Sequence, residues 1–245
     1  MRGQGRVNLK CLIKLSVVLF YLCVGQVAKA EDQPSLVVLQ LPGLTDQNDQ
    51  GAYANLYNTL QERGHISSWQ AAPSKRAHHI FIEQAAGCIA PASLDLLDKY
   101  KLSRDLFVIS VPFNKAVGSL LLAVSPPTPK GLKPIMGVVG FGVQHGIEQG
   151  SYRVEAVEDY DKLLKLISED RLDAAYIVHP DVMHYPDAAE KLKAYKGKAI
   201  PKWSGVDAIV CWKRYANSVS NITTYLQQGK IDGSLSRMLG KYYIE

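Results

Sequence analysis

The sequence has few cysteines and lacks the short motifs of several enzyme classes. Its four cysteines form no C-x-x-C pair, so neither a thioredoxin-like site nor a zinc site of that type is expected. It contains no G-x-S-x-G, no H-E-x-x-H and no P-loop. His78 and His79 are adjacent, and His179 and His184 are five apart, so neither pair suits one metal ion on a helical face. We therefore predict no metal site, no cofactor and no enzymatic activity.

A dinucleotide-binding glycine motif is also missing. Gly140-Phe141-Gly142 follows an apolar run, but the third glycine, Gly146, falls one residue beyond the G-x-G-x-x-G spacing. This near match does not support a nicotinamide or flavin site.

No apolar run is long enough to span a bilayer, but the first thirty residues have the pattern of a secretory signal. Arg2 and Lys10 belong to a basic start without acidic residues, and the apolar run Leu15–Val24 follows. A membrane helix needs about twenty apolar residues. Ala28-Lys29-Ala30 then places small residues where signal peptidase cleaves, just before Glu31. We expect residues 1–30 to be a cleavable signal peptide and the mature protein to be periplasmic.

Excess charge of one sign is absent once this segment is set aside. Five of the 28 lysine and arginine residues, and none of the 23 acidic residues, lie in 1–30, so the rest carries 23 of each sign. A balanced chain gives no electrostatic reason to bind nucleic acid. We expect a monomer without a nucleic-acid partner.

The rest of the chain alternates short apolar runs with helical stripes. Tyr53, Leu56, Tyr57 and Leu60 lie on one face of a helix, as do Tyr160, Leu163, Leu164 and Ile167. This order predicts parallel sheets covered by helices. The expected strands are 36–41, 66–69, 87–90, 107–111, 119–124, 135–139, 152–157, 173–178 and 206–212; the expected helices include 73–86, 93–100 and 187–195, with two more at the C-terminus.

A proline cluster at 126–129 separates two α/β units. We predict that 31–118 and 207–245 form lobe 1, that 125–203 form lobe 2, and that 119–124 and 204–212 are hinge strands. Lobe 2 is then inserted into lobe 1.

The order of weak motifs resembles the periplasmic solute-binding proteins of family 3, which have the two-lobed type II fold and serve ABC importers. Arg171–Ala175 is similar to the family's G-x-V-D-A strand entry, and Met136–Gly142 to the strand and glycine loop opening lobe 2. Pro73–Ala77 is similar to a Pro-x-x-Arg-Ala segment, and Val206–Arg214 to the C-terminal end of the family. The resemblance implies a small polar solute as ligand and an ABC importer permease as partner.

The sequence departs from the amino-acid-binding members of that family. The stretch Pro91–Leu94 holds no basic residue where those members place a carboxylate-clamping Arg. The start of the lobe 2 helix reads Gly146-Ile147-Glu148, and His179 stands where an Asp is common. These departures argue against a conventional α-amino acid ligand.

The resemblance places the ligand between the lobes, at strand C-termini and helix N-termini, where free N–H groups favour anions or acceptors. Arg76 offers two donors to a carboxylate or phosphate, and Trp69 and Phe113 offer aromatic surface. Structural roles for all three remain the alternative. The predicted ligand-binding residues are Leu44, Thr45, Trp69, Arg76, Pro91, Phe113, Phe141, Gln144 and His179.

The same resemblance brings the strands around Cys88 and Cys211 together in lobe 1. A disulfide or two buried free thiols are both open at this point.

The sequence is consistent with three functions. The leading one is a binding protein that delivers its solute to an importer. The others are a dehydratase-like enzyme acting on small acids, which needs an acid/base pair in the cleft, and a sensory or interaction protein that kept the fold without transport.

Overall fold

The computed structural model describes residues 33–244 except 42, 46–47, 49, 93–100, 140–146, 149 and 185–198. The helices expected at 93–100 and 187–195, and the export segment, lie outside the described residues.

The first lobe is built around β1 (Ser35–Leu39), which pairs in parallel with β2 (Ser68–Ala72) on one side and β3 (Cys88–Ala92) on the other. β3 is antiparallel to β9 (Ala199–Trp212), whose other edge pairs with β4 (Phe107–Ile109). Val37 and Val38 are both fully buried, since adjacent side chains of a strand point to opposite faces and both faces are covered.

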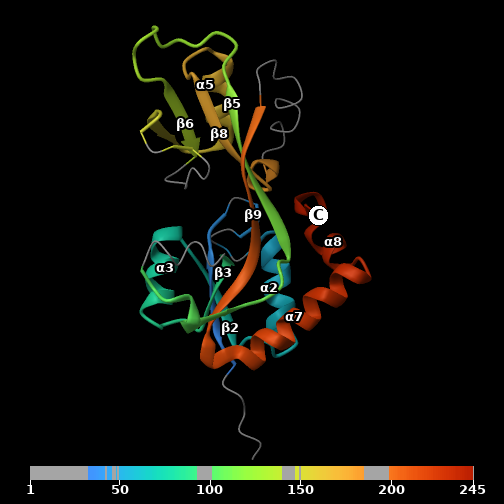
Figure 1. Ribbon diagram of the computed structural model, residues 1–245. Helices are drawn as coiled ribbons and strands as arrows, with labels where there is room; N and C mark the ends of the chain where they lie inside the picture. The colour runs from blue at the N-terminus through green and yellow to red at the C-terminus, as the bar shows by residue number, and fades with distance from the viewer. Residues whose placement is uncertain are drawn as a thin grey trace, which may run out of the picture. The chain divides into compact units, whose positions relative to one another are not determined.

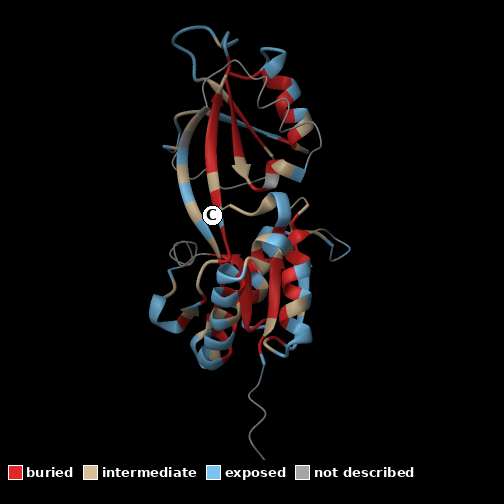
Figure 2. Ribbon diagram, turned by 90° about the vertical axis from the view of Figure 1, so that its right-hand side faces the viewer, coloured by how far each residue is buried: buried red, intermediate tan, exposed pale blue. Residues whose placement is uncertain are grey.

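Helices cover both faces of this sheet (Figure 2). On one face, α2 (Ala52–Glu62), α7 (Ala216–Ile231) and α8 (Ser234–Leu239) share a core with Leu36 and Val38. On the other face, α3 (Ser74–Ile82) contributes Ala77 and Phe81 to a core that contains Val37. The C-terminal helices therefore complete the first lobe.

The second lobe repeats the arrangement at a smaller scale. β6 (Ile135–Val139) lies between β7 (Arg153–Val157) and β8 (Ala174–His179), all parallel, and β8 pairs with the antiparallel β5 (Asn114–Leu122). α5 (Tyr160–Ser168) buries the predicted apolar stripe in the core of this lobe. Asp159 caps α5 by accepting a 2.7 Å hydrogen bond from the backbone N–H of Lys162.

Two long strands connect the lobes: β5 and β9 run side by side in antiparallel register from Asn114–Asp207 to Leu121–Ala199 (Figure 1). The first half of β9 pairs with β5 and its second half with β3, so the strand path is continuous from β2 to β7. Both strands begin earlier than the apolar runs 119–124 and 206–212, because their polar positions are supported by pairing with each other rather than by burial.

Other boundaries differ from the expected ones for local reasons. α7 continues past Gly229 to Ile231, and Gly229 packs against the start of α8, where a Cβ would lie 3.3 Å from Leu235. α3 ends at Ile82 rather than near 86, and Gln84 follows with a positive φ of 59°. Single 3-10 turns lie at Arg104–Leu106 (η1), Asp181–His184 (η2), Lys213–Tyr215 (η3) and Gly240–Tyr242 (η4).

Across the described ranges, no helix has the length and apolar character needed to cross a membrane.

Candidate ligand-binding site

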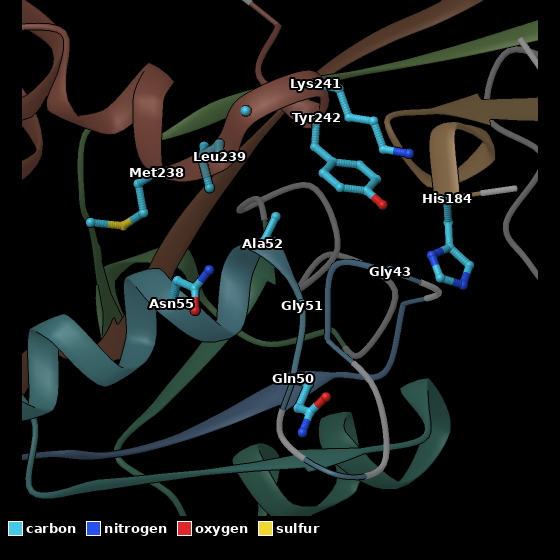
Figure 3. Close-up of a pocket in the computed structure, with 11 residues that line it drawn as sticks. Gly43, Gln50, Gly51, Ala52, Asn55, His184, Met238, Leu239, Lys241 and Tyr242 are labelled. Atoms are coloured by element: carbon cyan, nitrogen blue, oxygen red, sulfur yellow. The ribbon is translucent and has the colours of Figure 1, made fainter. Parts of the chain in front are cut away.

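A pocket of about 560 Å³ lies where the two lobes meet beside the C-terminal segment (Figure 3). One wall is the segment between β1 and α2 with the first turn of the helix, and another is the end of α8 with η4. The second lobe contributes His184 of η2. The lining residues are Gly43, Gln50, Gly51, Ala52, Asn55, His184, Met238, Leu239, Gly240, Lys241 and Tyr242.

The first turn of α2 is closed by its own preceding loop. The N–H groups of Ala52 and Tyr53 donate to the carbonyls of Gly43 and Leu44 at 3.2 and 2.9 Å, and Ala54 donates to Leu44 at 3.2 Å. These donors are the ones that an anion at a helix N-terminus would use. The expectation of free N–H groups is therefore wrong for the first turn of α2, because these three N–H groups are not available to a ligand. Side chains of the lining are the candidates for polar contacts with a ligand.

Gly43 lies at a close contact between the two lobes. Its φ of +70° is unfavourable for residues with a side chain, and a Cβ there would collide with the imidazole of His184 and lie 2.6 Å from its Cβ. The close approach of η2 to the β1–α2 segment therefore depends on glycine.

A hydrogen-bonded group lies behind the pocket, at the lobe 1 end of the β5–β9 pair. The hydroxyl of Tyr53 donates to the carboxyl of Asp207 at 2.5 Å and accepts from the amide of Asn114 at 2.6 Å. Burial raises the pKa of Asp207 to about 6, although the Tyr53 hydrogen bond acts in the opposite direction. Burial and the Asp207 charge together raise the pKa of Tyr53 well above its ordinary value.

Asn114 also holds the C-terminal segment. Its amide nitrogen donates to the backbone carbonyl of Tyr242 at 2.9 Å, and its amide oxygen accepts from the backbone N–H of Ile244 at 2.7 Å. One side chain thus satisfies two backbone groups of the tail and connects them to the hinge strand β5.

Three predicted site residues are part of the first lobe's packing. Phe113 is fully buried and makes edge contacts with Tyr53 and Tyr57 at ring distances of 5.0 and 6.3 Å. Thr45 is fully buried and its hydroxyl donates to the carbonyl of Leu39 at 2.6 Å. Trp69 lies near the start of β2, where its indole donates to Asn58 at 2.8 Å. Their positions support structural roles, and Leu44, also fully buried, belongs with them.

Of the remaining predicted residues, those that the structure describes do not line the pocket. Arg76 is exposed on α3, and Pro91 is buried within β3. His179 is half-buried at the end of β8, and burial lowers its pKa. Phe141 and Gln144 lie outside the described residues.

The residues that line or support the pocket were missed because their signals are weak in the sequence. Tyr242 belongs to the apolar stripe of the last expected helix, Lys241 precedes it without a pattern of its own, and Asn114 lies between the strands expected at 107–111 and 119–124. Asp207 had a readable signal: it is the one charged residue within the apolar run 206–212. A charge in such a run indicates a specific partner.

Cys88 and Cys211 form a disulfide between the paired strands β3 and β9. The described part of the chain contains no group of three or more His, Cys, Asp or Glu residues suited to one metal ion.

Two α/β lobes joined by paired crossing strands, with lobe 2 inserted into lobe 1, are the type II periplasmic-binding-protein fold. The likeness is one of structure alone, because neither a family model nor a curated protein sequence matches this chain.

Several solved structures share this fold. A periplasmic His/Glu/Gln/Arg/opine family-binding protein from Silicibacter pomeroyi, in complex with lysine, matches with a TM-score of 0.61 at 14% identity, covering 86% of this chain and 96% of that one. The GluR0 ligand-binding core from Nostoc punctiforme, in complex with L-glutamate, matches with a TM-score of 0.59 at 14% identity, covering 86% and 99%. The ancestral amino acid-binding protein AncCDT-1, a precursor of cyclohexadienyl dehydratase, matches with a TM-score of 0.57 at 13% identity, covering 91% and 100%.

Proposed function

We propose that this chain is an exported solute-binding protein, a divergent member of family 3, that captures a small polar solute between its lobes and presents it to an ABC-type importer. The observation that carries this proposal is the pocket of about 560 Å³ lined by residues of both lobes. Small-molecule sites usually have volumes of about 300–1,000 Å³.

Closure of the lobes supplies the mechanism. β5 and β9 are the paired connections between the lobes, so small backbone changes along them swing His184 toward or away from the Gly43 wall. A ligand touching both walls is bound better in the closed form, and that difference alone shifts the equilibrium. Hinge closure is the motion for which periplasmic binding proteins are known. The closed form would then be recognised by the permease.

A thermal-shift screen of residues 31–245 against amino acids, polyamines, organic acids and oxyanions tests this function. A ligand at 100 times its Kd stabilises by about 2.7 kcal/mol, which corresponds to a Tm increase of about 5–10 °C for a domain of this size. We expect one solute class to produce this shift and to be recovered chemically unchanged.

Two other results would replace the proposal. A changed solute would indicate the dehydratase-like enzyme, an alternative supported by the likeness to AncCDT-1. A silent screen would indicate the sensory or interaction protein. Export is tested separately, by N-terminal sequencing of the periplasmic fraction, where the expected first residue is Glu31.

A further inference from the structure

The C-terminal segment, defined here as Gly240–Ile244, forms a wall of the pocket. Gly240, Lys241 and Tyr242 line the pocket directly. The segment is held in place by Asn114, whose side chain pairs with the backbone at Tyr242 and Ile244. Asn114 is only 3% exposed, so this connection is shielded from competing water.

The Asn114 side chain is itself positioned by further hydrogen bonds. It donates to the Tyr53 hydroxyl, which donates to Asp207 across from it on β9. The wall is thereby connected to α2 and to both hinge strands. This buried amide, which donates two hydrogen bonds and accepts one, helps to set the position of the wall.

The wall brings a lysine to a lining whose other described residues include no Arg, Asp or Glu. Among the described lining residues, Lys241 is the one with a permanent charge, and its ammonium lies 5.2 Å from the centre of the Tyr242 ring. In Figure 3 the ends of Lys241 and Tyr242 lie on the side of the pocket that faces His184. Gln50 and Asn55 add amide groups across the pocket.

We propose that the Asn114-held C-terminal segment is the ligand-selecting wall of this pocket and that Lys241 makes it select solutes carrying a carboxylate. The inference rests on the proposed function and adds to it a solute class, a contact residue and a positioning residue. A lysine ammonium recognises a carboxylate as a point charge with three donors, so an acidic solute needs no arginine after β3.

The first test compares Lys241→Gln with Lys230→Gln, a matched exposed lysine on α7. The probes for calorimetric titration are succinate and glutamate as carboxylates, succinamide as the uncharged analogue, and putrescine as the cation. We expect succinate or glutamate to bind the wild type and Lys230→Gln equally, and Lys241→Gln to bind at least 10-fold more weakly. Binding of succinamide or putrescine alone, or an unaltered Kd in Lys241→Gln, overturns this inference and leaves the proposed function standing. If no solute in this panel or in the wider screen binds, both fall.

The second test addresses Asn114 as a positioning residue. Asn114→Ala should weaken carboxylate binding about as much as Lys241→Gln, and the double variant should be no weaker than either single one, because both changes remove the same contact. Additive losses would contradict this role. If Asn114→Ala does not fold, a chain ending at Gly240 replaces it; carboxylate binding by that chain at wild-type affinity would overturn the proposal.

Discussion

The folded structure shifts the pKa values of the Asp173 and Asp207 carboxyl groups in opposite directions. Asp173 accepts from the backbone N–H of Ile135 at 2.6 Å, and from the backbone and hydroxyl of Thr128 at 3.0 and 2.6 Å. Burial alone would raise the pKa of Asp173, but these hydrogen bonds lower it overall. Asp207 has one donor, Tyr53, and burial dominates, so its pKa is raised.

We predict that Asp207 makes the protein more stable as the pH falls from about 7 to about 4. Its folded pKa is about 6 and its ordinary value is 3.8, so the folded state binds the proton more tightly than the unfolded chain does. The gain begins near the folded pKa and is complete below the ordinary one, and is at most about 3 kcal/mol. Urea unfolding of Asp207→Asn should lack this gain, because the amide does not ionise. An identical pH profile in the variant would contradict the assignment.

Asp173→Ala should lower the free energy of unfolding by about 3 kcal/mol, since it removes hydrogen bonds to a charged acceptor and leaves their partly buried donors unpaired. Because the folded pKa of Asp173 is lowered, this contribution is present above pH 4 and is lost as the pH falls through the folded pKa. Denaturant melts at pH 7 measure it. The control is Asp105→Ala, an exposed carboxylate in η1, which should change stability by less than about 0.5 kcal/mol; equal losses would refute the role.

At the scale of elements, the long strand β9 connects structures that are distant in the chain. It pairs with β3, β4 and β5, and its Cys211 is joined to Cys88 over a sequence separation of 123 residues. Cross-linking so long a loop reduces the conformational freedom of the unfolded chain. The disulfide joins β3 to β9, the strand by which the chain returns from the second lobe, and so stabilises the first lobe.

Reduction of this disulfide should lower stability by about 3–5 kcal/mol, or about 10 °C in Tm. We expect dithiothreitol to produce this loss in the wild type and to leave a Cys88→Ser/Cys211→Ser variant unaffected. A thiol titration of the denatured, unreduced mature protein should find no free thiol. Two titratable thiols would show that the cysteines do not pair.

At the scale of the whole molecule, binding depends on how closely the second lobe approaches the first. The approach seen here places the imidazole of His184 against the backbone of Gly43, and Val182 and Met183 of the same turn pack in the second lobe's core. The contact is sterically tight, so a Cβ added to Gly43 would push the two lobes apart.

Gly43→Ala should hold the lobes apart. Small-angle scattering of the ligand-free variant should give a larger radius of gyration than the wild type, and the affinity found in the screen should fall at least 10-fold, about 1.4 kcal/mol. Adding His184→Ala should return the radius of gyration toward the wild-type value, because it removes the colliding ring. A Gly43→Ala protein with unchanged dimensions would mean that the contact does not limit closure.

The sequence by itself determined the elements whose stabilisation is local or periodic. β6 has the predicted bounds, and the stripe from Tyr160 to Ile167 is buried as its spacing requires, because a period of 3.6 or 2 is set by backbone geometry. Only the tertiary structure decided the length of β5 and β9, the pairing of Cys88 with Cys211, and the meeting of Asn114 with the C-terminal segment. These depend on partners that are distant in the chain, which leave no mark on local composition.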